Sequence, residues 1–388
     1  MSARRDLLRR VWIAGALLLV PAFAFAQAAA GVDTKPPSSW RFQLSADGTW
    51  YENAYFVGVS DGASSWSASG QASLSRERRF KNGSFTLSGF GGALYYPEID
   101  DFNQPTYGGS FTLKLSPSRR TKLHFGQSYS RSNTRSLRTL DIEGLPLPTS
   151  SLDNATSTAS LSQNLSQRIQ LALDGSYTWR RYDDERLTGG EQLYGTAQLG
   201  YQLGREGSIY LGYGYSASWL GEGPDAGPER SHQLQLGGRK QKDRGVGFEL
   251  AAGAGYVERT GTFYPAGRAG LTARGRRSSL SLLYYRDFGQ AFGYGRQTIG
   301  DIATASLGWT PVRRITFNAS YNFGYRRDPQ DESYTIRSDI ASAGFGWDVG
   351  GGVGFGASYS WERNETQGQP LVDGGRASAS LSYGVDWQ

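Results

Sequence analysis

The sequence predicts an all-β protein whose strands close into a transmembrane, antiparallel, up-and-down barrel of about 18 strands. First, apolar and polar residues alternate with period two along nearly the whole chain. Second, the alternating segments are about 9–13 residues long, the length that a tilted membrane-spanning strand needs. Third, short basic connections alternate with longer connections rich in acidic residues, Gly and Pro. A composition with 53 Gly, 23 Tyr and 10 Trp suits strands with one apolar and one wet face.

The N-terminal segment has the layout of a secretory signal peptide. Arg4, Arg5, Arg9 and Arg10 precede an apolar run, and Ala-Phe-Ala ends at Ala26. The run is too short to cross a bilayer as a helix. We therefore expect residues 1–26 to be cleaved, residues 27–39 to be a periplasmic linker, and residues 40–388 to form the outer-membrane barrel.

The strands are predicted from alternation alone. In "ITFNASYNFGY", residues 315–325, Ile315, Phe317 and Tyr321 share one face, and the intervening positions are polar or small. A range of about 16 to 20 strands remains, because the connection at residues 133–153 is long enough to hold a hairpin. The strands are expected to start near Trp40, Trp66, Phe85, Phe111, Leu123, Ala155, Ile169, Leu193, Ile209, Gln233, Val246, Ala269, Leu280, Ile302, Ile315, Ile340, Val353 and Ala377.

The last strand, "ASASLSYGVDWQ", alternates almost to the final residue. In a bilayer every backbone N–H and C=O must be satisfied within the protein, so the sheet must close on itself. The final strand is therefore expected to pair with the first. Leu381, Tyr383 and Trp387 would then face lipid, and Asp386 would face inward.

The inner face is predicted to be polar and to lean towards positive charge. Its alternation with the apolar face assigns ten charged residues to the channel lining: Arg41, Lys114, Lys122, Arg180, Arg239, Arg268, Arg274, Arg326, Glu249 and Asp174. A barrel this wide has a water-filled lumen unless something narrows it. Residues 133–153 are the expected folded-in loop. The lining indicates a route for a neutral or anionic hydrophilic solute. The alternative is that the charges only cancel one another and keep the lumen wet.

The short connections would form a basic rim on the periplasmic side. Its expected members are Arg78, Arg79, Arg119, Arg120, Lys242, Arg276, Arg277, Arg313 and Arg314. Such a rim either contacts phospholipid headgroups or docks an anionic polymer or a periplasmic partner. The acidic long loops, which include Asp183 and Asp184, are expected to contact lipopolysaccharide outside.

Enzymatic, metal-binding and nucleic-acid functions are not expected. The chain has no Cys and two His, and neither His124 nor His232 has a catalytic partner in its sequence context. No loop has the spacing of a calcium-binding EF-hand. The net charge of +6 includes +3 from Asp6 and four arginines of residues 1–26, which leaves only +3 on the mature chain. We therefore expect no cofactor and no nucleic-acid partner.

The signal, the strand periodicity and the ending "LSYGVDWQ" resemble Gram-negative outer-membrane barrels. The ending is similar to the C-terminal insertion signal read by the barrel-assembly machinery, although here Gln388 follows the aromatic. Size and charge resemble exopolysaccharide-secretion-associated barrels, of the alginate-exporter type and the myxobacterial export porins, as well as substrate-specific porins.

The resemblance to export barrels implies that the chain translocates a secreted polysaccharide, with a periplasmic polysaccharide-export protein as partner. One alternative is a substrate-specific porin for uptake of small hydrophilic or anionic nutrients, and another is a surface receptor or adhesin barrel. Export predicts a wide path through both mouths. Uptake predicts a tight constriction, and a receptor predicts no open pore.

Overall fold

The prediction of an 18-stranded antiparallel barrel is confirmed. The computed structural model describes residues 38–53, 64–97, 103–134, 150–220, 228–242, 244–292, 296–329, 331, 334–368 and 371–387. The strands are β1 Ser38–Tyr51, β2 Ser65–Phe80, β3 Gly83–Tyr95, β4 Gln104–Ser118, β5 Thr121–Asn133, β6 Ser151–Asn164, β7 Ile169–Tyr182, β8 Gly190–Gln202, β9 Gly207–Leu220, β10 Glu229–Lys240, β11 Gly245–Val257, β12 Thr262–Arg274, β13 Ser278–Ala291, β14 Arg296–Val312, β15 Ile315–Arg327, β16 Thr335–Gly350, β17 Val353–Thr366 and β18 Val372–Trp387.

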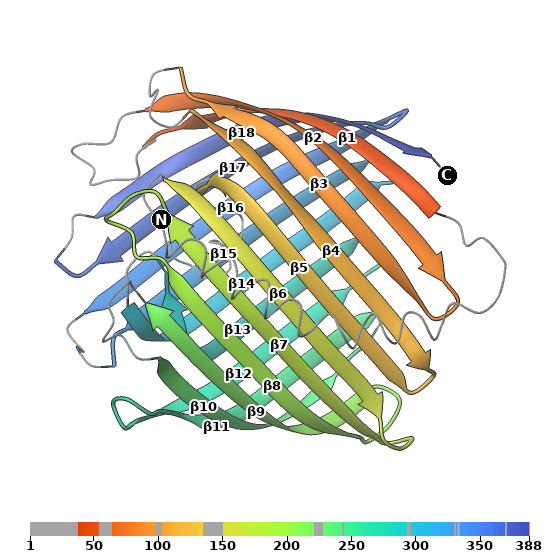
Figure 1. Cartoon of the computed structure of the whole chain (residues 1–388), viewed down its shortest axis with the longest axis vertical. Helices are drawn as coiled ribbons and strands as arrows, with labels where there is room; N and C mark the ends of the chain where they lie inside the picture. Colours follow the sequence, from red (N-terminus) through yellow and green to blue (C-terminus); the bar gives the residue numbers. More distant parts are fainter. Residues whose placement is uncertain are drawn as a thin grey trace, which may run out of the picture.

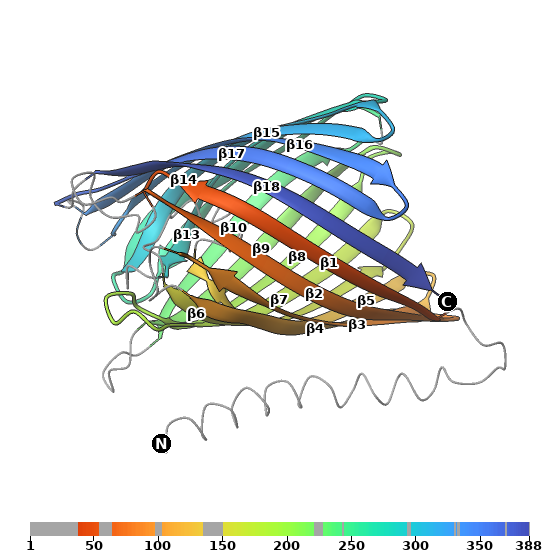
Figure 2. The same cartoon turned by 90° about the horizontal axis from the view of Figure 1, so that it is seen from above.

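The sheet closes between its first and last strands. Each strand pairs antiparallel with its neighbours in sequence, and β18 also pairs with β1, from Trp40 opposite Trp387 to Tyr51 opposite Arg376. Figure 2 shows the red first strand beside the blue last strand. Because β1 supplies its partner, β18 keeps its pairing up to the penultimate residue of the chain.

Alternation along the strands gives the barrel wall an outward and an inward face. The tilt of the strands is visible in Figure 1. Large apolar side chains lie on the outward face, where Leu211, Leu236 and Leu250 are 50, 66 and 60% exposed. Polar and small residues lie between them and point inward. An apolar surface of this extent would make a protein aggregate in water, and it suits a barrel surrounded by lipid.

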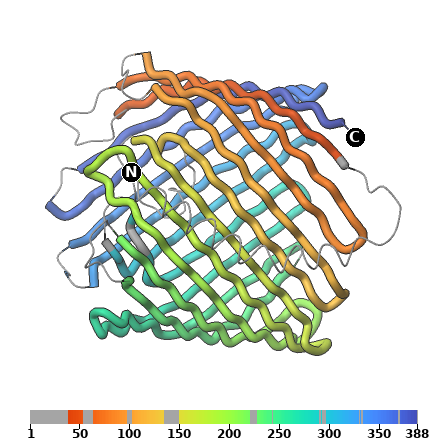
Figure 3. Tube along the Cα trace, viewed as in Figure 1, coloured from red at the N-terminus to blue at the C-terminus, as the bar shows by residue number. Residues whose placement is uncertain are grey.

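Connections of two kinds define the two ends of the barrel. One end, called here the short-turn rim, carries tight turns such as Lys81–Asn82 between β2 and β3. The first described residue, Ser38, and the end of β18 lie at the same rim (Figure 3). The β16–β17 turn there needs glycine, because Gly350, Gly351 and Gly352 all have positive φ. The opposite end, called here the long-loop rim, carries the longer connections.

Several strand boundaries differ from the prediction. β1 begins at Ser38, inside the predicted linker 27–39, because Ser38 and Ser39 still pair with Arg78 and Glu77 of β2. Other strands, such as β14 and β16, begin several residues before the apolar stretches that predicted them, since mostly polar residues continue the ladder there. The predicted signal peptide, 1–26, lies outside the described residues. Within those residues, no helix is long and apolar enough to cross a membrane.

Candidate functional site: a hairpin across the lumen

The strand register places the predicted channel-lining residues on the inward face. In β12, for example, Arg268 and Arg274 alternate with the exposed, outward Leu271. The same alternation holds on their own strands for all ten: Arg41, Lys114, Lys122, Arg180, Arg239, Arg268, Arg274, Arg326, Glu249 and Asp174.

The environment of these side chains changes along the barrel axis. Arg41, Lys114 and Arg274 lie near the short-turn rim and are exposed. Arg180 and Arg326 lie near the long-loop rim and are only 7 and 4% exposed. The lumen is therefore open towards the short-turn rim, and protein fills part of it towards the long-loop rim.

The β13–β14 hairpin leaves the barrel wall and fills part of this space. Pairing between β12 and β13 ends at Gly267 opposite Arg286, although β12 continues to pair with β11 up to Thr262. Pairing between β13 and β14 continues further, to Ala291 opposite Arg296. The end of the hairpin, residues 287–292 and 296–299 among those described, thus separates from β12 while β13 and β14 remain paired with each other. We call this part the lumen hairpin.

The lumen hairpin packs on the inner face of the wall. Where β13 still pairs with β12, the side of the strand that carries Phe288 faces outward. Phe288 itself nevertheless packs with Val257, Tyr264 and Ala266. These three residues belong to the inward faces of β11 and β12. The Phe288 and Tyr264 ring centroids are 6.1 Å apart. This apolar contact is possible only if the hairpin folds over the inside of β11 and β12.

The tip of the lumen hairpin reaches strands that lie far away around the barrel. Phe292 is 2% exposed and packs against Leu152 of β6 and Tyr182 of β7. The guanidinium carbon of Arg180 lies 4.6 Å from the centre of the Phe292 ring, a cation–π contact. On another side, the Gln297 side-chain amide donates to the hydroxyl of Ser218 in β9. Contacts with β6, β7 and β9 make the hairpin a bar across the lumen.

Charged side chains line this bar and the adjacent wall. Arg326 Nη1 donates to Thr298 Oγ1 at 3.4 Å, and Asp287 on the hairpin interacts electrostatically with Arg326 and Arg268. Arg268 Nε lies 3.6 Å from Glu249 Oε2, and the Tyr210 hydroxyl donates to Glu249 Oε1 at 2.9 Å.

These charged groups differ in their access to the lumen. Arg180 and Arg326 are only 7 and 4% exposed. The Arg268 side chain is 48% exposed, and that of its partner Glu249 is 29% exposed. A solute in the lumen would therefore meet Arg268 rather than Arg180 or Arg326.

The sequence predicts the folded-in segment at residues 133–153, of which 135–149 lie outside the described residues. It does not predict the lumen hairpin, because the hairpin keeps period-two alternation and its connection is short. The segment "YYRDFGQAFGYG", residues 284–295, carries one signal that could have indicated the hairpin. Its consecutive large residues are followed by aromatic residues, at positions where the other long loops carry acidic residues and Pro.

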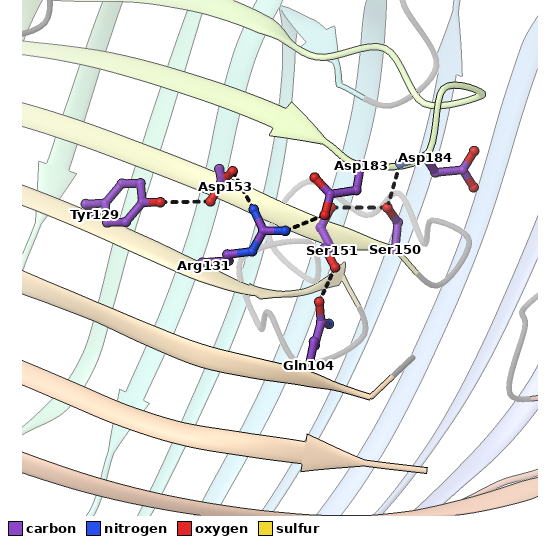
Figure 4. A network of polar contacts seen from close by, with 8 residues as sticks. All are labelled: Gln104, Tyr129, Arg131, Ser150, Ser151, Asp153, Asp183 and Asp184. Carbon is purple, nitrogen blue, oxygen red and sulfur yellow. Dashed lines mark hydrogen bonds and ion pairs between the residues drawn. The ribbon is translucent and has the colours of Figure 1, made fainter. Parts of the chain in front are cut away.

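The described ends of the 133–153 segment are tied together and to the wall. Thr134 N donates to Ser150 O at 2.8 Å, and Ser150 N donates to Thr134 Oγ1 at 3.0 Å. Beside them, Arg131 bridges Asp153, at 2.9 Å, and Asp183, while the Tyr129 hydroxyl donates to Asp153 at 2.8 Å (Figure 4). Ser151 donates to Gln104 of β4 in the same network. The cluster fastens β4, β5 and β6 to the β7–β8 connection.

Replacing Arg131 by Met is expected to lower the free energy of unfolding by about 1–2 kcal/mol, because Asp153 is left with fewer partners in a largely buried position. The Asp153 side chain is 13% exposed. Urea titration of the barrel in micelles measures the change. The matched control is Arg230→Met, since Arg230 and its partner Glu258 are 50 and 40% exposed and the loss of this pair should have little effect. Equal losses in the two variants would contradict this role for Arg131.

Most of the predicted basic rim lies in turns at the short-turn rim. Arg119, Arg120, Arg276, Arg277, Arg313 and Arg314 are exposed there, and Lys242 lies 3.4 Å from Glu206. The prediction for Arg78 and Arg79 needs correction, because β2 extends to Phe80 and makes both of them strand residues. Arg79 pairs with Glu77 at 2.7 Å on the inward face, and Arg78 points outward.

The two histidines lie apart. His124 is on the inner wall, whereas His232 is on the outward face between Tyr213 and Glu258, at 2.7 and 2.8 Å. Hydrogen bonding to His232 lowers the pKa of the Glu258 carboxyl, which lies in the β11–β12 turn. Among the residues that the structure describes, no group of three or more His, Asp or Glu could hold a metal ion.

Comparisons with known structures agree with the geometry. The barrel is similar to the crystal structure of Acinetobacter baumannii OccAB2, with a TM-score of 0.51 and 11% identity over 92% of this chain and 100% of that chain. OccAB4 of the same organism matches with a TM-score of 0.50 and 12% identity over 91% of this chain and 99% of that chain. Pseudomonas aeruginosa OpdO matches with a TM-score of 0.50 and 14% identity over 90% of this chain and 98% of that chain.

The chain shares the barrel fold of these three structures. At these identities the likeness extends to the fold alone. A scan against protein-family models and a search of curated proteins found no match.

Proposed function

We propose that this chain is an outer-membrane channel for the uptake of small hydrophilic solutes, with a preference for anions. The observation that carries the proposal is the lumen hairpin, which crosses a polar lumen inside a wall whose outward face is apolar. A porin fold with an internal constriction suits passive diffusion of solutes small enough to pass the constriction.

The lumen hairpin favours uptake over the export of a polysaccharide. Export predicts a wide, continuous path through both mouths. The contact of Phe292 with Leu152 and Tyr182 instead divides the lumen near the long-loop rim. A hydrated polymer would have to displace this packing, whereas a small solute would pass beside it. The polysaccharide and its periplasmic export protein are therefore not the partners that the geometry supports.

The preference for anions rests on the exposed guanidinium groups of the wall beside the hairpin. Arg268, whose side chain is 48% exposed, lies on the inward face and interacts with the hairpin residue Asp287. Basic side chains at a narrow point favour anions, because the narrow polar passage brings the solute within a few ångströms of them. Arg239, at 3.3 Å from Ser208, extends the positive wall towards the open half of the lumen.

The same proposal places the short-turn rim in the periplasm and the long-loop rim outside, after removal of residues 1–26. β18 would carry the signal for the barrel-assembly machinery. Lipopolysaccharide would contact polar clusters on the outward face of the long-loop half, where tyrosine hydroxyls donate to aspartates beside arginines. These clusters are Tyr129 with Asp153 and Arg131, Tyr284 with Asp301 and Arg286, and Tyr321 with Asp339 and Arg337.

Liposome swelling tests the proposal directly. Liposomes that contain the purified barrel should swell quickly in small anionic and neutral solutes, more slowly in cations of equal size, and not at all in oligosaccharides or dextrans. Equal swelling in dextran would overturn the constriction and restore polymer export. Failure to swell in any solute, with the barrel folded and inserted, would favour the receptor or adhesin alternative.

A further inference from the structure

A groove on the outward face crosses the first three strands close to the short-turn rim. Its volume is about 720 Å³, and most of its lining comes from alternate, outward-facing positions of β1, β2 and β3, with Ser73, Ser88 and Phe90 between them. The side chains that bound it are Trp40, Phe42, Leu74, Phe85 and Leu87, with Arg76 and Arg78 at one end. Its body is therefore apolar, and its only charged lining residues are two arginines.

Small residues keep this groove open. Ala72, Gly89 and Gly91 lie along it and face outward. A Cβ added at Gly91 would meet no atom within 4 Å, and one added at Gly89 would meet only a backbone oxygen at 3.8 Å. Close packing within the described residues therefore does not require glycine at either position. A larger side chain at Gly91 would occupy the groove itself.

Two positive charges stand at the end of the groove next to the rim. Arg76 and Arg78 follow one another on the outward face of β2, opposite Trp40 and Ser38 of β1. The guanidinium carbon of Arg76 lies 5.0 Å from the centre of the Trp40 ring. Among the described residues neither arginine forms an ion pair, in contrast to Arg79, which is paired with Glu77. Both are exposed, so they can receive an external anion.

We propose that this groove binds one anionic phospholipid of the leaflet at the short-turn rim. An acyl chain would lie along Phe42, Leu74 and Leu87, and the headgroup phosphate would contact Arg76 and Arg78. An arginine presents a planar fork of N–H donors that matches phosphate oxygens, and Trp40 lies at the depth where aromatic side chains meet headgroups. The proposal rests on insertion of the barrel in the outer membrane, as argued above.

Native mass spectrometry of the full barrel in mild detergent tests this inference. The barrel is titrated with phosphatidylglycerol or phosphatidylcholine of identical acyl chains. The wild type should retain one phosphatidylglycerol in preference to phosphatidylcholine. R76Q/R78Q should weaken the binding of phosphatidylglycerol about 10- to 30-fold, since each basic side chain at a lipid surface contributes about a factor of five. R119Q/R120Q, which removes two charges from a turn at the same rim, is the matched control and should bind as the wild type does.

A second variant tests the apolar part. Gly91→Leu fills the groove without touching the arginines, and it should reduce the binding of both lipids. Equal affinity of the wild type for the two lipids, or retention of the preference in R76Q/R78Q, would overturn the proposal. Swelling assays separate failure of the lipid proposal from failure of the channel proposal, because the groove lies outside the lumen. If the barrel conducts but shows no lipid preference, only the lipid proposal is overturned.

Discussion

Removing the lumen hairpin is expected to raise the single-channel conductance about threefold or more, because the lumen of an 18-stranded barrel is wide where nothing folds into it. The variant replaces residues 287–300 by Asn-Gly, which joins Arg286 directly to its partner Asp301. Asn-Gly is the preferred two-residue connection between antiparallel strands. The barrel should still close, because the deleted part makes no ladder with β12 and only Ile299 and Gly300 of it pair with β15.

Planar-bilayer recording measures the change, and circular dichroism together with heat modifiability establishes that the variant folds. Phe292→Ala is the milder companion. It removes the packing on Leu152 and Tyr182 and should give a noisier pore of slightly larger conductance. An unchanged conductance in the deletion variant would show that the hairpin does not limit the passage. The narrowest point would then have to be sought elsewhere in the lumen.

Neutralising the wall beside the hairpin is expected to remove the proposed preference for anions. In R239Q/R268Q, the ratio of anion to cation permeability should fall about 2- to 5-fold, as expected when charges a few ångströms from an ion in a wet lumen are lost. Glu249 lies 3.6 Å from Arg268 and would then be less compensated, which favours cations further. The reversal potential in a KCl gradient reports this ratio, and the effect should diminish at high salt.

R76Q/R78Q is the matched control, because it removes the same number of arginines from the outward face. Its reversal potential should equal that of the wild type. If both double variants shifted the potential equally, the overall charge of the protein would be responsible and the lumen would have no special part. If neither shifted it, the lining charges would serve only to keep the lumen wet.

Much of the fold was predictable because the constraint on it is local and repeated. Each strand must present apolar residues to one side and polar residues to the other, so the number and approximate positions of the strands can be read from alternation. The terminal strand illustrates this. Its alternation up to Trp387 predicted closure on β1, which the register with Trp40 confirms. The inward position of Arg268 follows from the same parity.

The exceptions have equally physical causes. Arg78 and Arg79 were assigned to a turn because basic residues mark the other short connections. The ladder with β3 nevertheless extends to Phe80 opposite Gly83, so the two side chains face opposite sides of the wall. The charge of Arg78 and Arg79 therefore indicated the correct end of the barrel, but it assigned them to a turn although they belong to β2. Alternation, applied to the same residues, would have separated Arg78 from Arg79.

The sequence by itself determined the closed barrel, its two faces and its two kinds of rim, because period-two alternation and connection length are properties of neighbouring residues. Only the tertiary structure decided which segment enters the lumen. Alternation is the same whether the end of a strand stays in the wall or folds inward. The choice depends on where β13 parts from β12, and on the packing of Phe288 and Phe292 against Tyr264 and Leu152, contacts between residues distant in sequence.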